Sequence, residues 1–237
     1  MTISQNTLVA EIAAQVPSSV RVFERHGVDF CCGGKKPIAV ACDERGLSFA
    51  DVAREIEESA ATNNDVDRDW TIAPLRTLAD HIVSVYHDAL RHKLPRLEEM
   101  AAKVVRVHGT KAPRLLARIE AILGELSADL NEHMRKEEQI LFPAIRNLER
   151  AGVSGMSISY PIRVMELEHD RAGELLEELR QLTEGFVPPV WACATARALY
   201  HGLAELEAEM HVHVHLENNV LFPRALALAD QTLGTGA

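Results

Sequence analysis

Two copies of one short pattern contain residue types that commonly bind metal ions. His133 and Glu137 stand four residues apart and precede a Phe-Pro dipeptide, and His213 and Glu217 repeat this arrangement 80 residues later. On an α-helix, residues four apart lie on the same face. Each copy can therefore direct one imidazole and one carboxylate at a single point. Mixed nitrogen and oxygen ligands suit iron, with manganese or zinc as alternatives by geometry.

A His-Asp dipeptide upstream of each copy adds a further imidazole. These histidines are His87 and His169, which lie 46 and 44 residues before the second histidine of their half. All six residues interrupt stripes of apolar residues with helical spacing, so they are expected to point into a protein core. Burying charged groups without partners is costly, and two divalent ions would balance them.

The competing interpretation is that these histidines are ordinary packing residues. A single core histidine is most often hydrogen-bonded within the protein, but this explanation is weak for a set repeated on four stripes. No cysteine lies on the stripes, which argues against zinc-finger or iron–sulfur ligation there. We therefore predict a two-ion site whose ligands are His87, His133, Glu137, His169, His213 and Glu217.

Long helices are needed to carry these stripes. Apolar residues recur every three or four positions over four segments, approximately 72–107, 112–149, 160–184 and 189–228. Short connections between long helices imply antiparallel neighbours. The sequence thus predicts an all-α fold with an up-down-up-down four-helix bundle. A ferritin-like bundle would need Glu-x-x-His on two helices, and near the site this spacing occurs once, from Glu166 to His169.

The first 60 residues differ from the rest in having short helical segments with abrupt stops. These segments are Leu8–Val16, Val20–Arg25 and Leu47–Ile56, and a tight glycine-rich turn, DFCCGGK, lies among them. Residues 61–70 are polar and lack periodicity, which is typical of a linker. The predicted organisation is a small helical cysteine-containing domain at 1–60, a linker at 61–70 and the bundle at 71–230.

Composition excludes several classes of function. The 237 residues are 47% hydrophobic and 25% charged, as in ordinary globular proteins. The net charge of −10 argues against a nucleic-acid partner. No apolar run is long enough to span a membrane, and the N-terminus lacks the features of a secretory signal. Four cysteines form a poor disulfide framework for this length, so we expect a reducing cytoplasm.

The ligand pattern on four helices resembles the hemerythrin-like di-iron domains. Joined to such a bundle, DFCCGGK resembles the repair-of-iron-centres family, of the ScdA, YtfE, DnrN and NorA type, as do KEEQILFP, EHDRAGELLEEL and HLENNVLFPRAL. The resemblance covers nearly the whole chain. It implies two non-haem iron ions on the six predicted ligands, with both glutamates bridging them beside an oxo or hydroxo group. The chain lacks an obvious counterpart of the fifth histidine of oxygen-carrying hemerythrins, which implies a position for a small ligand.

The resemblance also implies a role in the cytoplasmic response to nitrosative and oxidative stress. Family members are associated with restoring damaged iron–sulfur clusters and with binding or reducing nitric oxide. The implied partners are nitric oxide or O2 and damaged iron–sulfur proteins. Two alternatives stay open: a hemerythrin-like sensor or store for O2 or iron, and an enzyme that reduces nitric oxide catalytically. We predict no catalytic residue, and the N-terminal domain could mediate a homodimer.

Several further residues have chemistry of interest. The paired thiols of Cys31 and Cys32 are candidates for redox chemistry or iron transfer, with a simple packed turn as the alternative. We expect Cys42 and Cys193 to be buried small apolar residues. His81 and Glu138 are excluded as metal ligands. Glu168 and Tyr86 are candidates for tuning proton delivery, with a solvated or core position as the alternative. His211 and His215 are expected to point off the metal-facing stripe and to lie beside the ligands or in solvent.

Overall fold

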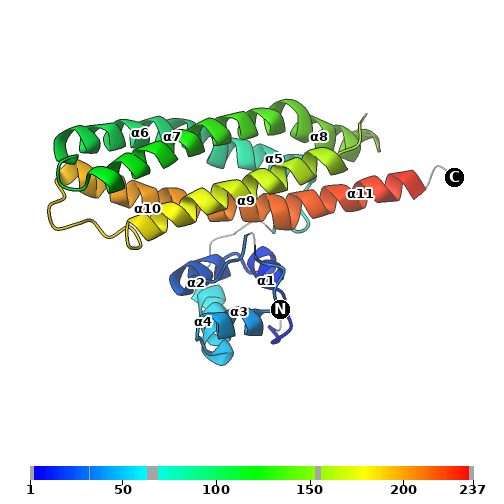
Figure 1. Cartoon of the computed structure of the whole chain (residues 1–237). Helices are drawn as coiled ribbons and strands as arrows, with labels where there is room; N and C mark the ends of the chain where they lie inside the picture. Colours follow the sequence, from blue (N-terminus) through cyan, green and yellow to red (C-terminus); the bar gives the residue numbers. More distant parts are fainter. Residues whose placement is uncertain (1–2, 32, 63–68, 153–155, 235–237) are drawn as a thin grey trace. The chain divides into compact units, whose positions relative to one another are not determined.

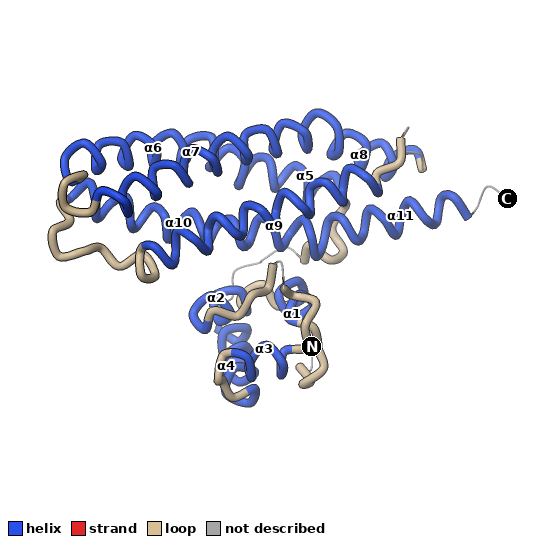
Figure 2. Tube along the Cα trace, viewed as in Figure 1, coloured by secondary structure: helices blue, strands red, loops and turns tan. Residues whose placement is uncertain are grey.

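The computed structural model describes residues 3–31, 33–62, 69–152 and 156–234. Throughout these residues the regular elements are helices, as Figures 1 and 2 show. Outside the helices, one isolated antiparallel bridge joins Leu8 to Pro37. The prediction of an all-α fold is confirmed.

Four long helical segments make up most of the chain after residue 74. Three of them contain one wider, π-helical turn, labelled η. In chain order the elements are α5 (Leu75–His81), η1 (Ile82–His87) and α6 (Asp88–His108); α7 (Pro113–Lys136), η2 (Glu137–Leu141) and α8 (Phe142–Ala151); α9 (Ser159–Leu182); and α10 (Ala194–His215), η3 (Leu216–Leu221) and α11 (Phe222–Gly234).

The start of the fourth segment differs from the prediction. Its first helix begins at Ala194 rather than at residue 189. After α9, the Thr183 hydroxyl donates to the carbonyl of Leu179 at 2.6 Å and accepts the backbone N–H of Phe186 at 3.1 Å. Gly185 then takes a left-handed conformation with φ of 75°. Two prolines follow, at positions 188 and 189, and they cannot donate to a helical ladder.

Contacts divide the chain into two compact units, one of which contains residues 80–144 and 157–210. In this unit α6 packs against α7, and α7 packs against α9. The predicted apolar stripes are its buried faces, so burial of these side chains is the main stabilising term. Fully or almost fully buried members are Leu90, Leu94, Leu97, Leu126, Leu130, Met165, Leu176, Leu203 and Leu206.

The other unit contains residues 1–79, 145–156 and 211–237. Its N-terminal helices are α1 (Val9–Gln15), α2 (Ser19–His26), α3 (Ile38–Glu44) and α4 (Phe49–Thr62). Helix α2 stops at Gly27, whose φ of 64° gives the left-handed end that the sequence suggested. Helix α3 was not predicted, because Ile38 is the only large apolar side chain among its buried residues and the apolar pattern is weak. Residues 63–68 of the predicted linker lie outside the described residues.

Two side chains fix the start of α5 within this unit. The Glu149 carboxylate accepts the backbone N–H groups of Leu75 and Arg76, at 2.6 and 3.1 Å. The Arg224 guanidinium donates to the carbonyl groups of Trp70 and Ala73, each at 2.6 Å. The Glu149 contacts satisfy backbone N–H groups that a helix start leaves open, and the Arg224 contacts hold the segment that leads into the helix.

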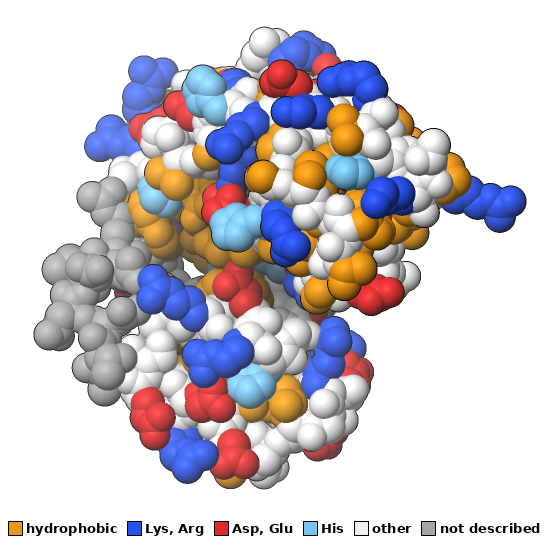
Figure 3. Space-filling view, turned by 90° about the vertical axis from the view of Figure 1, so that its left-hand side faces the viewer, with side chains coloured by type: hydrophobic (Ala, Val, Ile, Leu, Met, Phe, Trp, Pro, Cys, Tyr) orange, Lys and Arg blue, Asp and Glu red, His pale blue; other side chains and the backbone are white. Residues whose placement is uncertain are grey.

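The surface carries charges of both signs. On the face drawn in Figure 3, lysine and arginine side chains alternate with aspartate and glutamate side chains. Among the residues coloured there, no continuous basic area is presented to a phosphate backbone. Within the described residues, none of the helices is both long enough and apolar enough to cross a lipid bilayer.

Candidate metal centre

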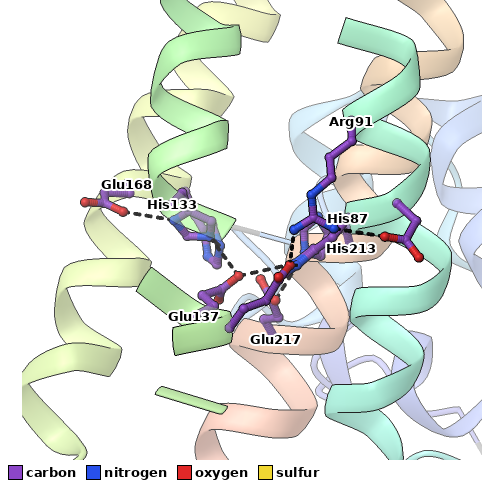
Figure 4. A network of polar contacts seen from close by, with 10 residues as sticks. His87, Arg91, His133, Glu137, Glu168, His213 and Glu217 are labelled. Carbon is purple, nitrogen blue, oxygen red and sulfur yellow. Dashed lines mark hydrogen bonds and ion pairs between the residues drawn. The ribbon is translucent and has the colours of Figure 1, made fainter. Parts of the chain in front are cut away.

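The six predicted ligand residues are all buried. His87 ends η1, Glu137 begins η2 and Glu217 lies in η3, while the other three histidines lie in α-helices. None of the six is more than 3% exposed. Figure 4 shows the side chains of His87, His133, Glu137, His213 and Glu217 pointing toward one another.

These side chains form two groups suited to a metal ion. One group contains His87, Glu137, His213 and Glu217, and the other contains His133, Glu137, His169 and Glu217. Within each group, one ligand atom from every residue lies within 4.8 Å of the others. Both glutamates belong to both groups. Since a carboxylate has two oxygens, each glutamate can bridge two neighbouring ions.

Individual distances show which atoms converge. Glu137 Oε2 lies 3.3 Å from His87 Nε2 and 3.4 Å from His133 Nε2. His133 Nε2 is also 3.0 Å from His169 Nε2. In the other repeat, His213 Nε2 lies 3.1 Å from Glu217 Oε1. His87, His133 and His213 therefore direct their Nε2 atoms at the carboxylates, and His169 directs its Nε2 atom at that of His133.

Two further carboxylates hold the opposite ring nitrogens. Glu138 Oε1 lies 2.7 Å from His87 Nδ1, and Glu168 Oε2 lies 2.9 Å from His133 Nδ1. An ionised carboxylate can only accept, so each Nδ1 carries the proton and each Nε2 keeps a lone pair directed at the centre. This tautomer is the one that binds a metal ion through Nε2, so these residues fit a metal centre.

Each of these carboxylates is in turn paired with a cation. Arg91 donates to Glu138, and Lys136 Nζ donates to Glu168 Oε1 at 2.5 Å. The hydrogen bond from His133, with help from Lys136, lowers the pKa of Glu168 to about 2 despite partial burial. Burial raises the pKa of Glu138, but hydrogen bonds from His87 and Arg91 outweigh it and lower that pKa overall. Both side chains therefore stay ionised at neutral pH.

Sequence reasoning excluded Glu138 as a ligand and left the role of Glu168 open. The structure places neither in the two groups, and it shows that both hold histidine rings. Spacing alone did not reveal this, because each carboxylate lies on a different helix from the imidazole that it contacts. His81 packs its ring edge against Tyr86, with centroids 5.8 Å apart, and also lies outside both groups.

The π-helical turns coincide with ligand residues. The N–H of Phe142 donates to the carbonyl of Glu137, and the N–H of Phe222 donates to that of Glu217, five residues back in each case. Proline follows each phenylalanine, and a proline inside an α-helix clashes with the carbonyl four residues before it. A wider turn accommodates the ring while the helix continues. The repeated Phe-Pro is the sequence signal for η2 and η3, whereas no such dipeptide follows η1.

Two protein families match this chain. Residues 78–225 match the model of the hemerythrin HHE cation binding domain, and residues 5–60 match a domain of unknown function, DUF542, called ScdA_N. A probable iron-sulfur cluster repair protein of Haemophilus influenzae is 39% identical over 229 residues, covering 95% of this chain and 99% of the relative. Iron-sulfur cluster repair protein YtfE of Escherichia coli is 42% identical over 219 residues, covering 92% and 96%.

The chain belongs to the hemerythrin-like iron–sulfur cluster repair family. The resemblance drawn from the sequence motifs is thereby confirmed. The match to a cation-binding domain spans every residue of the two buried groups. Together these findings identify a metal-binding protein, and its two buried groups of histidine and glutamate fit a metal ion.

Of the adjacent cysteines Cys31 and Cys32, the first lies within the described residues. Cys31 is buried, and Cys32 lies outside the described residues. Asp29 accepts the N–H of Cys31 at 3.0 Å and that of Gly33 at 2.8 Å, and the Cys31 thiol lies 3.4 Å from the same carboxylate. This cysteine therefore sits in a tight, hydrogen-bonded turn.

The expectation for the remaining cysteines is half right. Cys42 is fully buried in α3, as predicted, and burial raises its pKa. Cys193 is exposed, and the prediction that it is buried is wrong. It stands immediately before Ala194, the first residue of α10, where the chain enters the helix from the surface loop.

We expect Cys193 to react with alkylating agents with a midpoint near pH 7. Hydrogen bonds from the backbone of Ala196 and from the side chain of His108 lower its pKa to about 7, so the reactive thiolate forms as pH rises through that value. Peptide mass spectrometry after timed iodoacetamide treatment measures the rate. Cys42 serves as the slow internal reference, and His108→Ala should move the midpoint upward. A midpoint near 9 for the unmodified chain would contradict the assignment.

Loss of the Glu138 or Glu168 carboxylate, each of which contacts a histidine ring, should weaken metal binding without abolishing it. We expect Glu138→Gln and Glu168→Gln each to lower iron affinity by about 10–100-fold, because the imidazole loses the partner that sets its tautomer. Anaerobic competition with a chromophoric chelator measures this. Glu132→Gln is the matched control, since Glu132 is an exposed carboxylate of α7 paired with Arg135. Affinities equal to the control would disprove the roles of Glu138 and Glu168.

Proposed function

We propose that this chain is a di-iron protein of the nitrosative and oxidative stress response that repairs damaged iron–sulfur clusters. The observation that carries the proposal is the pair of buried groups that share Glu137 and Glu217. Curated relatives of nearly the same length are named iron–sulfur cluster repair proteins. Damaged iron–sulfur proteins are accordingly the proposed macromolecular partners.

We assign two non-haem iron ions to the centre. His87 and His213 would hold one ion, His133 and His169 the other, with the two glutamates bridging them. Each group supplies four side chains, which leaves room around a six-coordinate ion for an oxo or hydroxo bridge and for nitric oxide or O2. Ferrous iron with an open position binds such diatomic ligands and can also be passed to an acceptor.

The protein's own contribution is to orient the ligands. Glu138 and Glu168 fix the tautomers of His87 and His133, and Arg91 and Lys136 keep those carboxylates ionised. All six ligand residues are buried among apolar side chains, so bulk water is excluded from the site. Such a site favours ligand binding and metal transfer over acid–base catalysis, which supports a metal-binding stress protein more than an enzyme.

The proposed organisation keeps the boundaries 1–60, 61–70 and 71–230. The matches over residues 5–60 and 78–225 support this division. We place the protein in the cytoplasm because its cysteine usage suits a reducing compartment. A homodimer through the N-terminal domain is part of the same proposal.

Anaerobic transfer of iron from this chain to a damaged iron–sulfur enzyme tests the function directly. The reduced, iron-loaded chain is mixed with an iron–sulfur enzyme damaged by nitric oxide, and enzyme activity and iron content of the chain are followed together. We expect activity to recover as iron leaves the chain. Controls are an equal amount of free ferrous iron and the Glu137→Ala variant. Tight stoichiometric binding of nitric oxide without recovery would favour scavenging, and repeated turnover to nitrous oxide would favour a reductase.

A further inference from the structure

One helix near the C-terminus has two functional faces. His213 and Glu217 belong to the metal groups. The row His211, His215 and Asn219, also spaced by four residues, lies on an adjacent face of the same helix. The two histidines of this row were expected to lie beside the ligands or in solvent, and His215 is only 2% exposed.

The second face packs against the turn that contains Cys31. The ring of Phe30 lies edge-on against His215 and His211, with centroids 5.7 and 6.1 Å apart. Phe30 itself is 1% exposed, so it acts as an apolar anchor. Helix α1 also packs against η3, the turn that contains Asn219.

Hydrogen bonds fix the register of this contact. His215 Nδ1 lies 3.3 Å from the carbonyl oxygen of Phe30, and a carbonyl can only accept, so this nitrogen is the donor. Asn219 Nδ2 donates to the carbonyl oxygens of Phe30 and Cys31, at 3.3 and 3.0 Å. Both backbone oxygens beside the thiol are thus held by side chains from the metal-binding helix.

The described residues of this turn are also held by contacts within the turn. The Asp29 carboxylate accepts two of its backbone N–H groups. A Cβ atom on Gly34 would lie 2.5 Å from the Phe30 carbonyl oxygen and 2.8 Å from Ala10 Cβ, so a larger residue does not fit there. Contacts within the turn and at two of its carbonyl groups therefore hold its described residues against the helix.

We propose that His215 and Asn219 are positioning residues that hold the Cys31 turn at a fixed register on the helix carrying His213 and Glu217. The inference deepens the proposed function, on which its repair readout rests. Both faces of this helix would then serve cluster repair. One face carries the metal ligands, and the other holds the turn that contains the Cys31 thiol. Release of the turn should therefore slow cluster repair without removing iron.

Thiol labelling tests the positioning role independently of repair. In a Cys32→Ser, Cys193→Ser background, only Cys31 and Cys42 remain. Asn219→Leu, which keeps the approximate side-chain size but loses the donor, and His215→Ala should each raise the alkylation rate of Cys31 by about tenfold, the scale of losing one or two buried hydrogen bonds. The rate at Cys42 should not change. His201→Ala, an exposed histidine of the same helix, is the matched control.

The other readouts use the chain with all its cysteines. Asn219→Leu should keep about the iron content and visible spectrum of the unmodified protein while its repair rate falls several-fold, and Asn219→Gln, which keeps an amide donor, should restore part of the rate. An unchanged Cys31 rate in both variants would overturn the proposal. So would a parallel rise at Cys42, because it would indicate unfolding. If the unmodified chain repairs nothing, the proposed function fails while the labelling result still decides the positioning role.

Discussion

Glu137→Ala should empty the whole metal centre, whereas His87→Ala should empty half of it. Glu137 belongs to both groups, while His87 belongs to one. After anaerobic reconstitution with ferrous iron, we expect iron content to fall from about two ions per chain to about none for Glu137→Ala, and to about one for His87→Ala, since metal content follows ligand number. Elemental analysis against protein concentration measures the ratio.

Two further variants serve as controls for this comparison. Glu132→Ala removes an exposed carboxylate of α7 and should keep both ions. His169→Ala should mirror His87→Ala, because His169 belongs only to the other group. A Glu137→Ala protein that keeps two ions would contradict the assignment of Glu137 as a shared ligand. Equal losses in the His87 and Glu137 variants would show instead that the two ions bind as one cooperative unit.

Removal of the metal should lower thermal stability strongly. The two glutamates and four histidines of the centre are buried, so the ions offset charge that the apolar surroundings would otherwise oppose. Two ions each present at about 100 times their dissociation constant add roughly 5 kcal/mol to the free energy of unfolding. For a chain of this size, that corresponds to a fall in Tm of about 10–20 °C on removal.

Calorimetry of the iron-loaded protein before and after anaerobic chelation measures this shift. The Glu137→Ala variant provides the control, since chelation should leave its Tm almost unchanged. Addition of ferrous iron to the chelated protein should restore the original Tm. Coincident melting curves for the loaded and chelated protein would mean that the buried groups are balanced within the protein and that iron contributes nothing to folding.

Much of the fold was predictable because its determinants are local. Apolar residues at intervals of three and four mark each long helix, and Gly27 ends α2 where its backbone conformation requires a glycine. The predictions that were wrong or missing also have physical reasons. Helix α3 buries only one large apolar side chain, Ile38, so its pattern is weak. The Pro188–Pro189 pair cannot donate to a helical ladder, and the fourth segment begins only at Ala194. Cys193 is exposed although a small apolar residue is expected in the core, because residue type does not distinguish the start of a helix from its buried face.

The sequence by itself determined which helix faces carry the chemistry, because a spacing of four residues places His133 with Glu137, and His213 with Glu217, whatever the helices contact. Only the tertiary structure decided how those faces meet. The rotation and height of neighbouring helices make both glutamates common to two groups, and bring Glu138 to His87 and Glu168 to His133. Packing likewise turned His215 and Asn219 toward the Cys31 turn. Helical period defines a face, but the partner of that face depends on residues far away in the chain.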